Sequence, residues 1–150
     1  MASTLTKILL HIVFSTKRRE DLINPGIEDD LYGFIGGICR RMDSQLKVAG
    51  GTANHVHLLV NLGKTVSLSD LMLNIKRDSS KQIKELAPQL RDFHWQDGYF
   101  AFSIGESGVD DLSAYIRRQK EHHARVDFKD EIRILLKRYN VEYDEAFVWD

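Results

Sequence analysis

The sequence predicts an α+β protein, a ferredoxin-like antiparallel sheet with extra helices at its C-terminal end. Four short segments carry alternating or continuous apolar residues, which is typical of half-buried and buried strands. Two segments with apolar residues three and four positions apart separate these strands in the order β-α-β-β-α-β, the ferredoxin-like order. A length of 150 residues and a hydrophobic content of 43% suit one domain spanning residues 1–150.

The first strand and the first helix are expected at the start of the chain. Residues Thr4 to Thr16 are apolar at both alternating sets of positions from Ile8 onward, apart from His11, so we expect a central strand that is covered on both faces. A turn signal, the sequence NPG, follows this strand. Ile27 to Met42 then predicts a helix, because its apolar residues recur every three and four positions.

A hairpin and the second helix come next. The segments QLKVAGG (45–51) and HVHLLVNLG (55–63) predict two strands joined through a tight turn that contains glycine. Ser67 lies three residues before Asp70, as in a helix-capping box, and Pro88 ends the helix that follows.

The rest of the chain predicts one more strand and two more helices. The aromatic and β-branched residues of YFAFSIG, Tyr99 to Gly105, favour the fourth strand. The segment ESGVDDLSAYIRRQKEHHARV (106–126) predicts a third helix with Ser107 as its cap. A last helix is expected over Phe128 to Tyr139.

No feature of the sequence indicates secretion or a membrane span. His11 interrupts the N-terminal apolar run, which also lacks a basic region in front and a small-residue cleavage site. No apolar stretch approaches the roughly 20 residues that cross a bilayer, and the single Cys39 cannot form an internal disulfide. We therefore expect a soluble, cytoplasmic protein without a membrane partner.

Two histidines stand one residue apart in the third expected strand. Because side chains alternate along a strand, His55 and His57 point to the same face, while Val56 and Leu58 point to the other. Two neutral imidazoles held on a rigid strand form half of a site for a divalent metal. A structural or solvent-facing pair is the alternative reading of the same pattern.

The third helix carries residues that could complete such a site. At about 100° per residue, Gln119 falls within the stripe of Leu112, Ile116 and His123, where a buried amide needs a partner. Tyr115 lies one turn earlier, on the edge of that stripe. If this helix covers the histidine face of the sheet, Gln119 supplies a third ligand through its carbonyl oxygen, and Tyr115 lies beside the metal. The alternative is an amphipathic helix with an exposed glutamine and a packing tyrosine.

These motifs resemble those of a known protein family. NHVHLLV is similar to the histidine-hydrophobic-histidine (HUH) motif, and YIRRQ to the tyrosine motif, of the single-tyrosine HUH transposases of small bacterial and archaeal insertion sequences. REP-associated tyrosine transposases are close relatives. The segments HIVFSTKRR, IKRDSSKQI and WQDGYFAFSIG resemble the first strand, the second helix and the approach to the fourth strand of this family.

The resemblance implies a specific chemistry. His55, His57 and Gln119 would bind Mg²⁺ or Mn²⁺, and Tyr115 would be the nucleophile. A phenol with a pKa of about 10 attacks poorly unless it is deprotonated and its phosphodiester target is polarised by a metal. The tyrosine would become joined to the 5′-phosphate and leave a 3′-OH, so the site could rejoin DNA without a nucleotide cofactor. His11 and His122 are auxiliary candidates for the general base.

The resemblance also implies partners: single-stranded DNA that forms hairpins, and a second copy of the chain in a homodimer. The formal net charge is −1, but the last twelve residues carry four acids and no base, so the other 138 residues hold 21 bases and 18 acids. Single-strand binding needs basic tracks rather than a large net charge. The expected phosphate contacts, which are also typical of solvated surfaces, are Lys17, Arg18, Arg19, Lys76, Arg77, Lys81 and Lys84.

Two departures and two rival functions remain. The residues before His55 are GGTAN, where many relatives have a Met-Pro turn, and the terminal FVWD is expected to pack on the body or on a dimer partner rather than on DNA. One rival is a non-cleaving single-stranded nucleic-acid-binding protein of the same fold. The other is a metal-dependent hydrolase that uses activated water and leaves Tyr115 idle.

Overall fold

A four-stranded antiparallel sheet forms the centre of the molecule, in a computed structural model that describes residues 3–150. The strands lie in the order β2-β3-β1-β4, so that β1 and β3 are central. This is the ferredoxin-like arrangement that the order of elements predicts, and it confirms the expected fold class. The strand bounds are β1 Leu9–Ser15, β2 Gln45–Gly51, β3 His55–Asn61 and β4 Phe100–Ile104.

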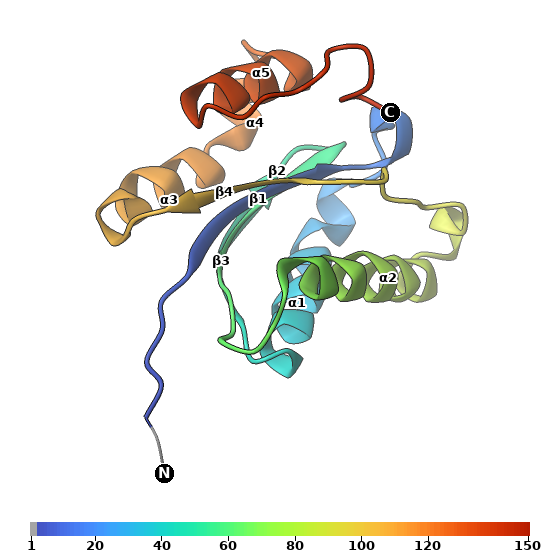
Figure 1. The fold of residues 1–150 in the computed structure, drawn as a ribbon. Coiled ribbons are helices and arrows are strands. Elements are labelled where there is room, and N and C mark those ends of the chain that lie inside the picture. Colours follow the sequence, from blue (N-terminus) through green and yellow to red (C-terminus); the bar gives the residue numbers. More distant parts are fainter. Residues whose placement is uncertain (1–2) are drawn as a thin grey trace.

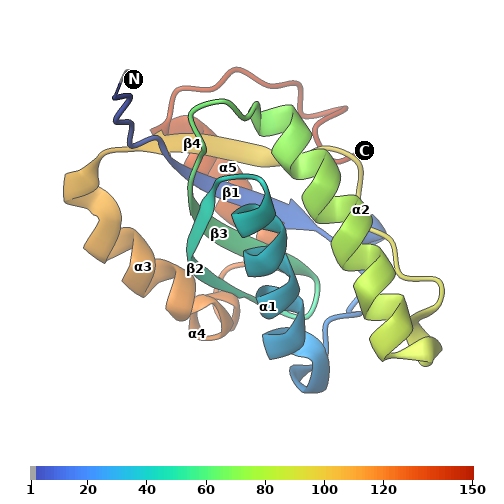
Figure 2. The same cartoon turned by 90° about the horizontal axis from the view of Figure 1, so that it is seen from below.

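Helices cover both faces of the sheet (Figure 1). Two long helices, α1 (Pro25–Arg41) and α2 (Leu68–Leu86), lie side by side across one face, as the view from below shows (Figure 2). The other face carries α3 (Val109–Arg117), α4 (Gln119–His123) and α5 (Phe128–Arg138). Within residues 3–150, no helix is long and apolar enough to cross a membrane.

The alternation along the central strands assigns each face its role. Ile12 and Phe14 of β1, with Val56 and Leu58 of β3, point into the main hydrophobic core beneath α1 and α2. The residues between them point to the other face, where apolar contacts with α3 and α5 are divided into two smaller clusters. The histidines lie on this second face, as the two-residue period of a strand predicts.

In the first half of the chain, the predicted start of the first strand is wrong and the predicted cap of the second helix is confirmed. β1 begins at Leu9 rather than at Thr4, because its neighbours end there: Leu9 pairs with Asn61 of β3 and with Ile104 of β4. The cap of α2 is confirmed, since the hydroxyl of Ser67 accepts a hydrogen bond from the backbone N–H of Asp70 at 3.1 Å.

The third predicted helix is broken into α3 and α4. Arg118 departs from helical geometry (φ −100°, ψ 20°), and its N–H is shared between the carbonyl groups of Ala114 and Tyr115. The prediction that Ser107 caps this helix is wrong, because Ser107 lies in a 3₁₀ turn (Glu106–Gly108) and the helix begins only after Gly108. The break turns α4 so that Gln119 is fully buried.

Candidate active site

The second face of the sheet holds a buried cluster of polar side chains. His55 and His57 on β3 and His11 on β1 are each no more than 1% exposed. Across the β1–β3 ladder, Ser15 lies opposite His55 and Val13 lies opposite His57. The rigid backbone of two central strands therefore fixes all three imidazoles.

Both histidines of β3 have a partner for Nδ1. His55 Nδ1 lies 2.8 Å from Asn54 Oδ1, an atom that only accepts, so this nitrogen carries the proton. His57 Nδ1 lies 2.8 Å from His11 Nε2. Partners of this kind orient metal-binding imidazoles by leaving the other ring nitrogen free to act as a ligand. The two Nε2 atoms face the same interior space.

A carboxylate occupies the middle of that space. Glu131 of α5 is 1% exposed, and its Oε1 lies 3.0 Å from His57 Nε2, 2.8 Å from His123 Nε2 and 3.5 Å from His55 Nε2. Burial alone would raise the pKa of Glu131, but its contacts with the histidines outweigh burial and hold that pKa well below its usual range. The carboxylate is therefore ionised at neutral pH.

Burial keeps the imidazoles neutral at the same pH. It lowers the pKa of His11 to about 3 and that of His55 to about 4, and it lowers the pKa of His57 as well. A neutral imidazole is the form that binds a metal ion. The cluster thus combines neutral nitrogen donors with one negative charge.

The donor set fits a divalent cation. One donor atom from each of His55, His57, His123 and Glu131 lies within 4.8 Å of the others. Gln119 Oε1 also faces this point, 3.2 Å from His55 Nε2. His55 carries its proton on Nδ1, so the lone pair of its Nε2 faces the oxygen atoms of Gln119 and Glu131. All of these atoms are electron-pair donors, which repel one another unless a cation lies between them.

Tyr115 lies at the edge of the cluster. Its hydroxyl donates a hydrogen bond to Glu131 Oε2, which also accepts from Gln119 Nε2 at 3.0 Å. Burial and this carboxylate raise the pKa of Tyr115, so the phenol is protonated at neutral pH. Two cavities, of about 460 and 280 Å³, are lined by Tyr115, so the residue borders open space.

The structure brings most of the sequence-predicted site residues together. Tyr115, Gln119, His55 and His57 converge on Glu131, and each of the auxiliary candidates contacts the cluster: His11 through His57, and His122 at 3.4 Å from Glu131 Oε2. The residues converge as expected; their chemical roles stay predictions.

The predicted phosphate contacts do not gather at this site. Those of α2 lie on the opposite face of the sheet, where Lys76 Nζ donates to the carbonyl oxygen of Gln96 at 2.7 Å and Arg77 Nε donates to Asp78 Oδ1 at 2.9 Å. Of the 3₁₀ turn after β1, Lys17–Arg19, only Arg19 lines a cavity beside the cluster. That the predicted basic residues of α2 and of the 3₁₀ turn contact DNA stays a prediction. The residues on α2 are Lys76, Arg77, Lys81 and Lys84.

The sequence reasoning missed Glu131 as a site residue. A signal was present, because Glu131 lies on the stripe of Phe128, Ile132 and Leu135, where an acid breaks an otherwise apolar face of α5. His123 was placed on the buried stripe of the third helix but was not expected to be a ligand.

Two arginines beside Tyr115 were not among the predicted site residues. Arg118 lines both cavities beside the tyrosine, and Arg138 lines the larger one. They bring positive charge close to the phenol.

One glycine sets the distance between α3 and the sheet. A Cβ atom on Gly50 of β2 would lie only 2.3 Å from the carbonyl oxygen of Ile116. Only glycine allows the backbone of α3 to approach so closely. Since Tyr115 precedes Ile116, this contact also sets how deeply the tyrosine reaches into the cluster.

Comparison with known proteins is consistent with this geometry. The sequence profile of the family described as IS200-like transposases matches residues 4–119. A transposase candidate from Deinococcus radiodurans R1 has a similar structure (TM-score 0.65, 19% identity, covering 79% of this chain and 95% of that one). So has a REP-associated tyrosine transposase bound to a REP hairpin (TM-score 0.62, 14% identity, covering 96% and 90%). A search of curated proteins found no match.

The neutral buried histidines predict that the metal-free protein loses stability in mild acid. Unfolded histidines bind protons near pH 6.5, whereas His11 and His55 do so in the folded protein only near pH 3 and 4. The unfolded chain therefore binds more protons as the pH falls from 7 to 5, and the free energy of unfolding decreases by up to about 1.4 kcal/mol per pH unit for each histidine. Chemical denaturation across this range, in the presence of a chelator, measures the slope.

Two variants separate this effect from a general acid sensitivity. His11→Gln removes one buried imidazole and should reduce the slope, whereas His94→Gln changes an exposed histidine and should leave it unchanged. If stability depended on pH with the same slope in both variants, the buried histidines would not be the cause of the acid sensitivity.

Gly50→Ala is expected to displace α3 from the sheet. The clash with Ile116 should destabilise the fold by about 1–3 kcal/mol. It should also weaken Mn²⁺ binding, because Gln119, the first residue of α4, is joined to α3 by Arg118 alone and is displaced with it. The matched control is Gly37→Ala in α1, where no atom lies within 4 Å of the added methyl group. Alanine there should stabilise the helix by about 0.5–1 kcal/mol. Equal effects of the two variants on Mn²⁺ affinity would show that the close approach at Gly50 is not needed.

Proposed function

Because the chain belongs to the IS200-like transposase family, we propose that it cleaves and rejoins single-stranded DNA through a covalent bond between Tyr115 and a 5′-phosphate. The observation that carries this proposal is the convergence of a tyrosine, two neutral histidines and a glutamine on one buried point. A non-cleaving binding protein or a water-activating hydrolase would have no use for Tyr115 at that place.

We propose that His55, His57 and Gln119 hold a divalent cation, with Glu131 and His123 within reach of the same position. When bound, the cation withdraws charge from the non-bridging oxygens of the phosphate and stabilises the leaving oxygen. Imidazole ligands suit Mn²⁺ better than Mg²⁺, which prefers oxygen donors and water. Both ions remain candidates, with the donor set favouring Mn²⁺.

The side chains of the site provide the path for the proton. The O–H bond of Tyr115 already points at Glu131 Oε2, so the carboxylate takes the proton as the phenolic oxygen forms its bond with phosphorus. The bond between phosphorus and the 3′-oxygen breaks. The 3′-oxygen leaves with the electron pair and takes up a proton from solvent to become a 3′-OH, while Glu131 returns its proton to solvent. Attack by a 3′-OH on the phosphotyrosine bond reverses each step, which rejoins DNA without a nucleotide cofactor.

Arginines beside the tyrosine are suited to hold the substrate. Arg118 and Arg138 line the cavity at Tyr115 and can pair with the phosphates on either side of the reacting one. The similar REP-associated transposase is bound to a REP hairpin, and by analogy we propose a hairpin-forming single strand as the substrate. A homodimer, as in the resembling family, is part of the same proposal.

A covalent adduct on a denaturing gel tests the function. The protein is mixed with Mn²⁺ or Mg²⁺ and labelled single strands from the flanks of its gene, with duplex DNA as a control. We expect an adduct with single strands only, and its complete loss in Tyr115→Phe. The matched control, Tyr139→Phe, removes the hydroxyl of a second tyrosine on the same cavity and should keep the adduct.

Three outcomes would contradict the proposed chemistry. An adduct that persists in Tyr115→Phe would assign the nucleophile to another residue. Free 5′-phosphate products without an adduct would identify water as the nucleophile. Binding of DNA without cleavage on any flank fragment would favour the non-cleaving binding protein.

A further inference from the structure

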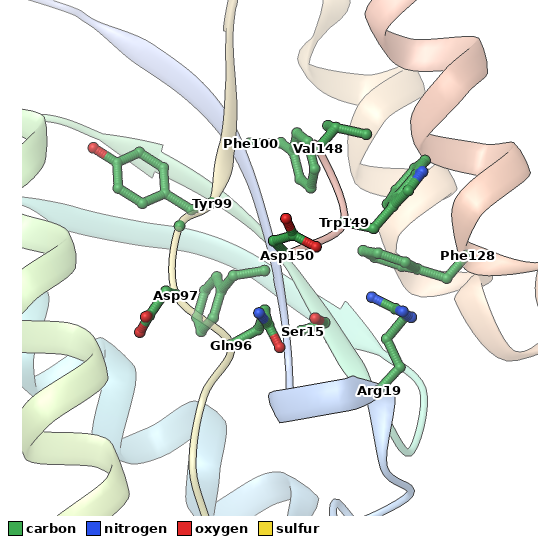
Figure 3. A pocket seen from close by; sticks show the side chains of 12 residues that line it. Ser15, Arg19, Gln96, Asp97, Tyr99, Phe100, Phe128, Val148, Trp149 and Asp150 are labelled. Carbon is green, nitrogen blue, oxygen red and sulfur yellow. The ribbon is translucent and has the colours of Figure 1, made fainter. Parts of the chain in front are cut away.

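A third cavity adjoins the cluster and is not lined by Tyr115. It has a volume of about 240 Å³ and lies between the end of β1, the segment 96–100, the start of α5 and the last residues of the chain (Figure 3). This volume is just below the roughly 300–1,000 Å³ of pockets for drug-sized ligands. The space suits one small ring system rather than a larger molecule.

Aromatic rings form much of the cavity wall. The side chains of Phe100, Phe128 and Trp149 gather in one part of it (Figure 3). The indole of Trp149 is held in place: its Nε1 donates to Glu145 Oε1 at 3.2 Å, and Arg133 Cζ lies 5.1 Å from the ring centre. Fixed aromatic faces are the surfaces on which unpaired bases stack.

The remaining wall is polar and of mixed charge. Arg19 supplies donors, Asp97 and Asp150 supply acceptors, and Ser15 and Gln96 supply hydrogen-bonding groups of both kinds. A phosphate would be repelled by two carboxylates, whereas the edge of a neutral base offers donors and acceptors together. The chemistry of this wall therefore matches a base rather than the DNA backbone.

The backbone that carries Arg19 is held in an unusual conformation. Arg18 and Arg19 both have positive φ angles, 57° and 55°, which non-glycine residues rarely adopt. A hydrogen bond from the N–H of Arg18 to Gln96 Oε1, at 3.0 Å, ties this turn to another residue of the cavity wall. Strain of this kind concentrates where a side chain is positioned for binding.

The cavity shares two residues with the surroundings of the metal-binding candidates. The ring of Phe128 lines the cavity and also lies 4.7 Å, centre to centre, from the ring of His55. Ser15 lines it as well and pairs with His55 across the sheet. A strand whose phosphate reached His55 would bring a neighbouring base to this cavity.

We propose that this cavity binds one unpaired base of single-stranded DNA, in the nucleotide next to the phosphate that Tyr115 attacks. The inference rests on the proposed function and adds to it a pocket that binds one base of the strand beside the cleavage point. It revises the expectation that the terminal FVWD segment only packs on the body, because Trp149 then contacts DNA directly.

The test measures equilibrium binding to the full-length chain carrying Tyr115→Phe, so that no cleavage interferes. The probes are single strands from the flanks of the gene, intact or with one abasic nucleotide moved along the strand. We expect one abasic position, and Trp149→Ala, each to weaken binding by about tenfold, within the range that a stacked base contributes. Combining the two should cost no more than either alone, since both remove the same contact.

Matched variants distinguish this contact from a general effect. Trp149→Phe keeps an aromatic face and should bind within about twofold of the parent. Phe147→Ala lies in the same tail, is 69% exposed and does not line the cavity, so it should have no effect. Arg19→Ala should weaken binding to the intact strand more than it weakens binding to the strand that is abasic at the sensitive position.

Two results would overturn the base pocket while leaving the proposed function intact. One is an adduct formed by the wild-type chain although no abasic position affects binding. The other is a Trp149→Ala variant that weakens every probe by the same factor, including the abasic ones. A third result would be that Trp149→Ala and one abasic position weaken binding through the same contact, but the wild-type chain forms no adduct. This result would overturn the proposed cleavage, and with it the placement of that base beside a reacting phosphate.

Discussion

The site depends on a buried carboxylate that is balanced by neutral donors. Glu131 brings a negative charge into a space that is almost closed to solvent, where an unpaired charge would cost several kcal/mol. Contacts from His57, His123 and Gln119, together with the hydroxyl of Tyr115, offset that cost. The same contacts bring strand β3 and helices α3, α4 and α5 to one point, so the interaction that stabilises the C-terminal helices also assembles the groups to which we assign the chemistry.

The two faces of the sheet have different roles: one holds the main hydrophobic core and the other holds the polar site. One face, under α1 and α2, is a continuous apolar core that holds the central strands rigid. The other face has its apolar contacts divided into two smaller clusters, and the polar site lies on the strands between their helices. Close packing at Gly50 and the helix break at Arg118 then adjust α3 and α4 separately to that rigid surface. A site built on central strands keeps its geometry while Tyr115 still borders two cavities.

Local patterns were sufficient to predict the strands, the long helices and the shared direction of His55 and His57. These features follow from side-chain periods of two and 3.6 residues, which a sequence displays directly. The placement of Tyr115 and Gln119 beside them followed from one assumption, that their helix covers the histidine face. Glu131 was not predicted because its role depends on α5 folding back over the sheet, which no local pattern encodes. Trp149 was expected only to pack, since nothing near it in sequence indicates that β1 and α5 leave a cavity beside it.

Electron paramagnetic resonance of bound Mn²⁺ is the most direct test of whether His55 and His57 form a metal centre. We predict that bound Mn²⁺ shows couplings to imidazole nitrogen in the wild-type chain and in His94→Gln, where an exposed histidine is changed. His55→Gln and His57→Gln should each lose a nitrogen coupling and weaken the binding of the ion. Mn²⁺ that binds without nitrogen couplings, or that binds both variants as it binds the wild type, would contradict a metal centre built on these two histidines.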